Sequence, residues 1–104
     1  MILIYIVAPG REEAKSITRE LITSKLAFSA NILPDVFSIR MGEKGMEEYT
    51  ETLVLIKTRA HLYTEVEKKV LEIRVNGNPM IFSLPITQIS HDLFSRIQNY
   101  TNSG

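Results

Sequence analysis

Two long strand-like runs, Phe28–Met41 and Glu48–Thr58, lie on either side of the segment Gly42-Glu43-Lys44-Gly45. Two glycines within four residues are a strong turn signal, so the pattern predicts a β-hairpin. A typical strand has about 5–6 residues, and at roughly 3.3 Å per residue the first run would reach about 45 Å. A compact domain of this size has a radius of gyration of about 13 Å. The hairpin is therefore expected to extend beyond its own domain and to offer an uncovered strand edge for pairing with another chain.

The segments around the hairpin alternate between strand and helix patterns. Ile2–Val7 and Met80–Ile86 are apolar on both alternating faces, and so is the inner part of the second hairpin run, from Leu53 to Ile56. Strands of this kind are typical of covered, central positions in a sheet. Three stretches have helical period: Arg11–Leu26, Ala60–Arg74 and His91–Tyr100. The order predicts an α+β, ferredoxin-like β-α-β-β-α-β fold in a single domain over residues 1–104, with an extra C-terminal helix.

Local signals refine this arrangement. Pro34 cannot donate to a strand ladder, so it marks an edge, a bulge or a bend. Thr58 and Ser90 are the expected N-caps of the second and third helices. Glu65 and Lys69 are expected to pair at i, i+4 on the surface of the second helix. The segment Asn76–Pro79 breaks the chain before the last strand, and the polar tail Thr101–Gly104 is expected to fray.

The fold leaves one face of the sheet in need of cover. The first and third strands are expected in the middle of the sheet, and the first two helices, which connect strands, cover only one face of it. The terminal helix or neighbouring subunits would have to cover the other face, and a three-fold ring of head-to-tail hairpins is the natural closed form. On this view Leu55→Asp would abolish folding, because it places an unpaired charge in a central strand.

Composition excludes several functions. Twelve basic and twelve acidic residues give a formal net charge of zero, so no global field favours nucleic acid or an anionic membrane. There is no cysteine, hence no thiolate site. The apolar run Met1–Ala8 is far shorter than the ~20 residues that span a bilayer, and no basic segment precedes it. We expect a cytoplasmic protein. It has no Ser-His-Asp order, phosphate loop or paired-carboxylate spacing, so we expect it not to be an enzyme.

Three stretches carry a resemblance to a known family. The run Leu26–Pro34, the run Met46–Thr58 and the start of the chain, Met1–Ala14, are similar in register to the CutA divalent-cation tolerance proteins. Ser29 stands where that family usually has cysteine, and the segment Arg74–Met80 lacks its usual histidine, tyrosine and acids. The resemblance implies a homotrimer built by the hairpins, a role in tolerance of copper and other divalent metals, and similarity to the trimeric PII signalling proteins.

Candidate ligand-binding residues are polar groups near the strand ends: Ser29, Asn31, Glu51, Lys57 and Arg11. Lys57 could hold an anion together with the helix that Thr58 begins, or it could pair with a carboxylate. Asn31 could bind a ligand or tie down the bend at Pro34. No catalytic residue is expected.

Metal-binding candidates are sparse. His61 and His91 each begin a helix and are either surface residues or Cu or Zn ligands. The acidic residues of the second hairpin run could hold a hard cation or keep that strand soluble: Glu47, Glu48 and Glu51. The methionines are interpreted as too scattered for a Cu(I) site and as fillers of apolar gaps: Met41, Met46 and Met80. Two functions remain open: a divalent-cation tolerance trimer, or a PII-like trimer that binds a small anion or metabolite between subunits.

Overall fold

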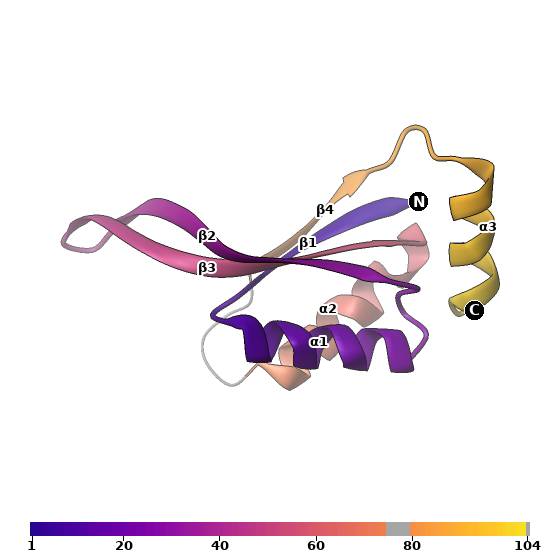
Figure 1. The fold of residues 1–104 in the computed structure, drawn as a ribbon, viewed down its shortest axis with the longest axis horizontal. Coiled ribbons are helices and arrows are strands. Elements are labelled where there is room, and N and C mark those ends of the chain that lie inside the picture. The colour runs from indigo at the N-terminus through magenta and orange to yellow at the C-terminus, as the bar shows by residue number, and fades with distance from the viewer. Residues whose placement is uncertain (75–79, 104) are drawn as a thin grey trace.

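The computed structural model of this chain describes residues 1–74 and 80–103. Its elements follow in the order β1 (Ile2–Ala8), α1 (Arg11–Thr23), β2 (Ala30–Gly42), β3 (Gly45–Thr58), a 3-10 turn (Ala60–Leu62), α2 (Tyr63–Ile73), β4 (Met80–Pro85) and α3 (His91–Tyr100). The four strands form one antiparallel sheet in the order β2-β3-β1-β4 (Figure 1). The predicted α+β, ferredoxin-like arrangement with β1 and β3 in the middle is therefore confirmed. The expected breaker at residues 76–79 lies outside the described residues.

The β2–β3 hairpin is the longest feature of the molecule. The chain measures 47 × 27 × 20 Å along its principal axes, and Figure 1 shows the hairpin running well beyond the helices. β3 begins at Gly45, three residues before the predicted start at Glu48, because Gly42 and Gly45 still pair across a two-residue turn. Gly45 has φ +123°, a backbone conformation that residues with a Cβ atom rarely adopt. The ladder shifts register between Leu33 and Val36, so the interruption predicted at Pro34 is a β-bulge.

Helices α1 and α2 lie together under one face of the sheet (Figure 1). The apolar side chains of both helices meet the inward-facing residues of β1 and β3, which alternate along each strand. The fully buried members of this core are Ile4, Ile6, Ala8, Ala14, Ile17, Leu21, Ala27, Val54, Ile56, Leu62, Val66 and Val70. α1 ends at Thr23 rather than at Leu26, because Lys25 has φ 60°, in the left-handed region. The backbone N–H groups of Leu26 and Ala27 both donate to the carbonyl oxygen of Leu21.

Two local predictions for the second helix are wrong. Thr58 does not cap it: its hydroxyl is fully buried and donates to the carbonyl oxygen of Leu26 at 2.8 Å, and the 3-10 turn separates it from α2. The ammonium of Lys69 also does not pair with the carboxylate one turn earlier, at Glu65. It lies 3.3 Å from Glu20 of α1 and 3.8 Å from Glu72, since the two helices are close enough for an ion pair between them.

Helix α3 packs at the end of the sheet and leaves the second face open (Figure 1). Its predicted cap is confirmed, because Ser90 Oγ accepts the N–H of Leu93 at 3.2 Å. The predicted fraying is wrong for the start of the tail. Thr101 is buried and accepts Nε of Arg59 at 3.0 Å, while the N–H of Asn102 donates to the Lys25 carbonyl at 3.0 Å. These bonds fix the end of α3 against Arg59, which follows β3, and against the chain between α1 and β2.

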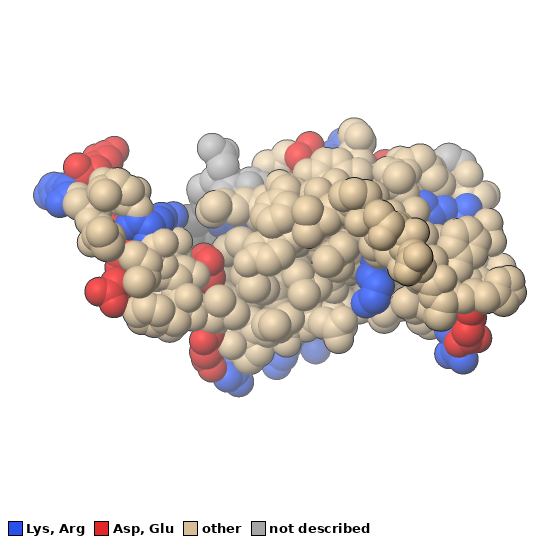
Figure 2. Space-filling model, turned by 90° about the horizontal axis from the view of Figure 1, so that it is seen from above, with Lys and Arg blue, Asp and Glu red and all other residues tan. Residues whose placement is uncertain are grey.

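The open face of the sheet is apolar. Cross-strand neighbours Tyr5, Leu55 and Phe82 lie in one row, with the Tyr5 and Phe82 rings stacked at 4.6 Å. Figure 2 looks down on this face and shows charged side chains mostly at its margins and on the hairpin. Leu55 belongs here and is partly exposed, whereas its neighbour Ile56 is the fully buried residue. A single copy therefore does not bury residue 55 completely, which was the reason given for expecting Leu55→Asp to abolish folding. No helix among the described residues is long and apolar enough to cross a membrane.

Candidate functional site

A hollow of about 260 Å³ lies where the hairpin leaves the sheet. The end of β1, the base of the hairpin, the end of α2 and the start of β4 contribute to its wall. The lining residues are Val7, Ala8, Pro9, Arg40, Tyr49, Thr50, Glu51, Arg74 and Met80. We call it the hairpin-base hollow. Its volume is somewhat below the range of ordinary small-molecule sites, so it suits a small ligand.

The hairpin-base hollow carries two guanidinium groups and one carboxylate. The Arg40 guanidinium lies over the Tyr49 ring at 4.8 Å, and its Nε is 3.6 Å from a carboxylate oxygen of Glu47. Arg74 donates from Nη1 to the carbonyl oxygen of Val7 at 3.1 Å. Arginine presents several donors in a planar fork, which matches the oxygens of a carboxylate or a phosphate. The hollow is therefore chemically suited to a small anion.

Arg74 is held in place from the opposite side. Its Nε lies 3.7 Å from Glu13 Oε2, and both side chains are largely buried, with 12% and 16% of their surface exposed. A buried ion pair of this kind fixes side-chain position, because breaking it would leave an uncompensated charge away from water. The guanidinium is thus preorganised at the wall of the hollow.

Of the five predicted ligand-binding residues, Glu51 alone lines the hairpin-base hollow. Its Oε1 accepts the hydroxyl of Ser38 at 2.7 Å. Arg11 instead forms an exposed ion pair with Asp35 at 2.8 Å, next to the bulge. Lys57 lies six residues from Glu51 along β3, or roughly 20 Å in an extended strand. Within one copy, the structure therefore does not bring Glu51, Arg11 and Lys57 together.

Asn31 and Lys57 do lie close to each other on the open face. Asn31 is the cross-strand partner of Leu55, so Lys57 is its diagonal neighbour, about 7–8 Å away. Ser29 is exposed and precedes β2. Lys57 shares a face with Leu55 rather than with the buried Ile56, so it points away from the helices. The anion site between Lys57 and the start of the following helix stays a prediction, and within one copy Lys57 lies on the face away from α1 and α2.

The metal-binding candidates do not converge within one copy. Among residues 1–74 and 80–103, no three His, Asp or Glu side chains gather in a way that could hold a metal ion. Glu47 pairs with Arg40, whereas Glu48 is opposite Ile39 on the other face of the hairpin. His61 and His91 are exposed on different elements.

The interpretation of the methionines needs correction. Met41 and Met46 are cross-strand partners at the hairpin tip, so these two are not scattered. Met41, Met46 and Met80 are 72%, 74% and 56% exposed, so none of the three fills an apolar gap within one copy.

Sequence reasoning missed Arg40, Tyr49 and Arg74 as members of the hollow. Simple alternation from Leu33 would place Arg40 on the helix side of the sheet. The bulge inserts one extra residue into β2 and so moves Arg40 to the face that carries Tyr49 and Glu51. Assigning a β-bulge at Pro34, and continuing the alternation of faces along β2 from that point, would have placed Arg40 on the correct face.

This fold defines a class: ferredoxin-like α+β proteins with helices on one face of the sheet and a protruding β2–β3 hairpin. Comparison with known proteins shows which family within this class. A family model described as CutA1 divalent ion tolerance protein matches residues 2–99. The chain belongs to this family, and the resemblance found in its sequence is confirmed.

Relatives from distant organisms support the assignment to this family. The divalent-cation tolerance protein CutA of Archaeoglobus fulgidus is 37% identical over 83 residues, which are 80% of each chain. The chloroplastic CutA of Arabidopsis thaliana is 29% identical over 98% of this chain, which spans 56% of the plant protein. The crystal structure of CutA1 from Oryza sativa superposes with a TM-score of 0.93 at 27% identity, covering 99% of this chain and 94% of that one.

Proposed function

We propose that this chain acts as a non-enzymatic homotrimer in the tolerance of divalent cations, copper among them. On this proposal residues 1–104 form one functional unit, and the protein works in the cytoplasm. The observation that carries the proposal is the apolar open face of the sheet in a chain of the CutA1 family. A sheet face of this kind, next to a hairpin that extends past its own core, has no partner among the described residues.

The exposed apolar residues support assembly through two surfaces. The first, the open face, exposes Leu33, Met80, Phe82 and Leu84. The second is the outer hairpin, where Phe37, Ile39 and Met41 alternate along β2 with Met46 opposite. Large exposed apolar areas on a protein of this size are typical of interaction surfaces. Two different surfaces on one chain favour a head-to-tail contact, which must close into a ring to avoid a filament.

A cation would have to be held between copies or handled indirectly. The described part of one copy offers no group of three ligands, whereas a three-fold axis would repeat each hairpin carboxylate three times. Oxygen ligands of this kind would suit Zn(II) or Cu(II) less well than imidazole or thiolate would. Calorimetric titration of the assembled protein with Cu(II), Zn(II) and Ni(II) tests this. Binding tighter than millimolar supports direct metal handling. The absence of such binding for all three metals rules direct metal handling out.

A second candidate function is a PII-like regulatory module that binds a small anion or metabolite at clefts between subunits. The observation that favours it is the hairpin-base hollow with Arg40, Arg74 and Glu51 at its wall. The polar group of Ser29, Asn31 and Lys57 on the open face, and Arg11 near the bulge, are the remaining candidate contacts. A bound anion raises the melting temperature by mass action, so thermal-shift measurements with phosphate, sulfate and citrate distinguish this function from metal binding. Arg74→Met should abolish any shift that arises in the hollow.

A further inference from the structure

Every methionine after Met1 is exposed in a single copy. Met41 and Met46 at the hairpin tip are 72% and 74% exposed, and Met80 at the start of β4 is 56% exposed. The chain has four methionines and no cysteine, so thioethers are its only sulfur groups. Methionine side chains ordinarily fill gaps in apolar cores. The three thioethers at the surface of one copy are instead accessible to oxidants dissolved in water.

These three methionines lie on the two surfaces proposed to join copies. Met80 lies on the open face, as the cross-strand partner of Val7. Met46 is ten residues from the buried Ile56 along β3, so both point to the face that α1 and α2 cover farther along the strand. The hairpin tip lies beyond those helices (Figure 1). The helices of the same copy therefore leave Met46 and its partner Met41 in water.

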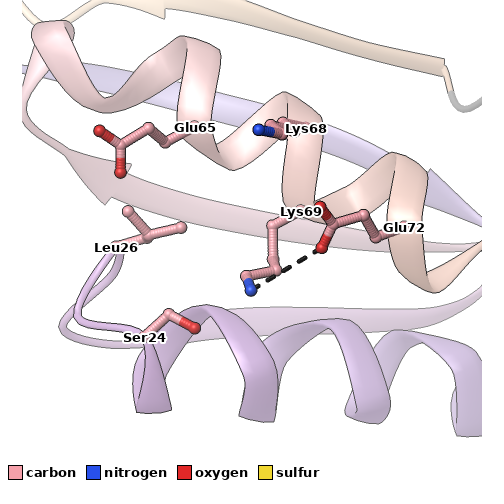
Figure 3. A pocket seen from close by; sticks show the side chains of 6 residues that line it. All are labelled: Ser24, Leu26, Glu65, Lys68, Lys69 and Glu72. Carbon is pink, nitrogen blue, oxygen red and sulfur yellow. Dashed lines mark ion pairs between the residues drawn. The ribbon is translucent and has the colours of Figure 1, made fainter.

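The helices offer no comparable groups. α1, α2 and α3 contain no methionine. A hollow of about 460 Å³ between the end of α1 and α2 is lined mainly by polar and charged side chains (Figure 3). There Lys69 lies 3.3 Å from Glu20 and 3.8 Å from Glu72. A mild oxidant of thioethers does not change such groups, so its effect is concentrated on the open face and the outer hairpin.

We propose that Met41, Met46 and Met80 are oxidation sites that control assembly, an inference that rests on the proposed homotrimer. A hydroperoxide converts their thioethers to sulfoxides in an unassembled copy, and the oxidised copy no longer joins a ring. With hydrogen peroxide, the sulfur attacks one oxygen, the O–O bond breaks and an S–O bond forms. The sulfur loses two electrons, and the second oxygen leaves as water. Methionine sulfoxide reductases reverse the change.

The physical reason is the polarity of the sulfoxide oxygen. The neighbours of each methionine on its strand face are apolar: Ile39 precedes Met41 on β2, and Phe82 follows Met80 on β4. A polar oxygen buried among such side chains without a hydrogen-bond donor disfavours assembly. In a three-fold ring this penalty arises in every subunit. Assembly in turn covers the sulfurs, so the oxidant acts on copies that have not yet joined.

The test oxidises the full chain while it is unassembled. The chain is unfolded in guanidinium chloride, treated with hydrogen peroxide, freed of both reagents and refolded. We expect a native far-UV circular dichroism spectrum, because none of the three methionines is buried in one copy. Light scattering should give the 11.8 kDa of one chain, where the untreated, refolded chain gives three times that mass. The concentration of half-assembly should rise at least about tenfold.

The matched control is the triple variant Met41→Leu, Met46→Leu and Met80→Leu. It keeps apolar side chains at these positions and leaves Met1 as the only thioether. Its assembly should be the same before and after peroxide treatment. A second measurement needs no variant. In a partly oxidised sample of the unmodified sequence, peptide mass spectrometry should find sulfoxide at the three positions enriched in the monomer fraction over the trimer fraction.

Four results would overturn the proposal. An oxidised chain that assembles as the untreated chain does would remove it and leave the proposed homotrimer standing. An equal loss of assembly in the triple variant, or equal sulfoxide content in the two fractions, would show that these sulfurs are not responsible. A disordered spectrum of the oxidised chain would show that oxidation acts on folding. An untreated chain that refolds as a monomer would remove the homotrimer itself, and the inference with it.

Discussion

Two neighbouring residues of β3, Leu55 and Ile56, offer a sharp test of the open face. They point to opposite sides of the sheet: Ile56 is fully buried against the helices, and Leu55 lies on the open face beside Tyr5. The same substitution, to aspartate, therefore puts the same charge in two different places. We expect Ile56→Asp to unfold the chain and Leu55→Asp to leave it folded but unable to assemble.

The expected magnitudes follow from burial. Ile56→Asp loses about 1.5–3 kcal/mol of apolar burial and leaves an unpaired charge in the core, which costs about 3–5 kcal/mol more. The sum is comparable with the whole stability of about 5–15 kcal/mol of an ordinary domain. In a single copy of Leu55→Asp the carboxylate can reach water, so the loss is about 1–2 kcal/mol. Between copies the same carboxylate would be desolvated in every subunit, which costs about 3–5 kcal/mol each time.

Far-UV circular dichroism and sedimentation velocity separate the two outcomes. The expected result for Leu55→Asp is a native spectrum with a single slow boundary near the monomer mass, and for Ile56→Asp a disordered spectrum. The reasoning is refuted if Leu55→Asp sediments as the unmodified protein does, because the open face would then not be an interface. An unfolded Leu55→Asp together with a folded Ile56→Asp would show that the two faces are assigned the wrong way round.

Three further substitutions test local features. Thr58→Val keeps the shape but leaves the buried Leu26 carbonyl without its donor, which should lower the free energy of unfolding by about 1–3 kcal/mol in a urea titration. Arg59→Ala removes the donor to Gln98 O, Thr101 O and Thr101 Oγ1, so amide hydrogen exchange in α3 should become faster while that in β1 is unchanged. Burial, and then the Glu67 carboxylate that accepts its hydroxyl, raise the pKa of Tyr63 above its usual value. The folded state thus holds this proton more tightly, so stability should fall as the pH rises above about 10, and less steeply in Tyr63→Phe.

The arrangement of strands and helices could be predicted because each depends on local periodicity. Residues apolar on both faces of Ile2–Val7 placed that strand in the centre, and the glycines at 42 and 45 located the turn. Errors arose where a side chain bonds far along the chain. The Thr58 hydroxyl bonds to Leu26, thirty-two residues away, rather than to the helix that follows it, and no local pattern shows this.

The hairpin-base hollow was harder to predict than the fold. It combines residues from several elements. Arg40 reaches it only because the bulge changes the face of β2 on which the Arg40 side chain lies. Glu51 was found because it lies at the base of the hairpin. Lys57 was grouped with it, although Glu51 lies midway along β3 and Lys57 lies near its end, six residues away. Distances along an extended strand are large, so two residues that are close in sequence can still be too far apart to contact the same small ligand.

The molar mass of the unmodified chain in solution tests the central claim most directly. Light scattering after size-exclusion chromatography at micromolar concentration should give about 35 kDa, three times the 11.8 kDa of one chain. A folded particle of 11.8 kDa would contradict the claim, because the open face and the outer hairpin would then be stable in water without a second copy.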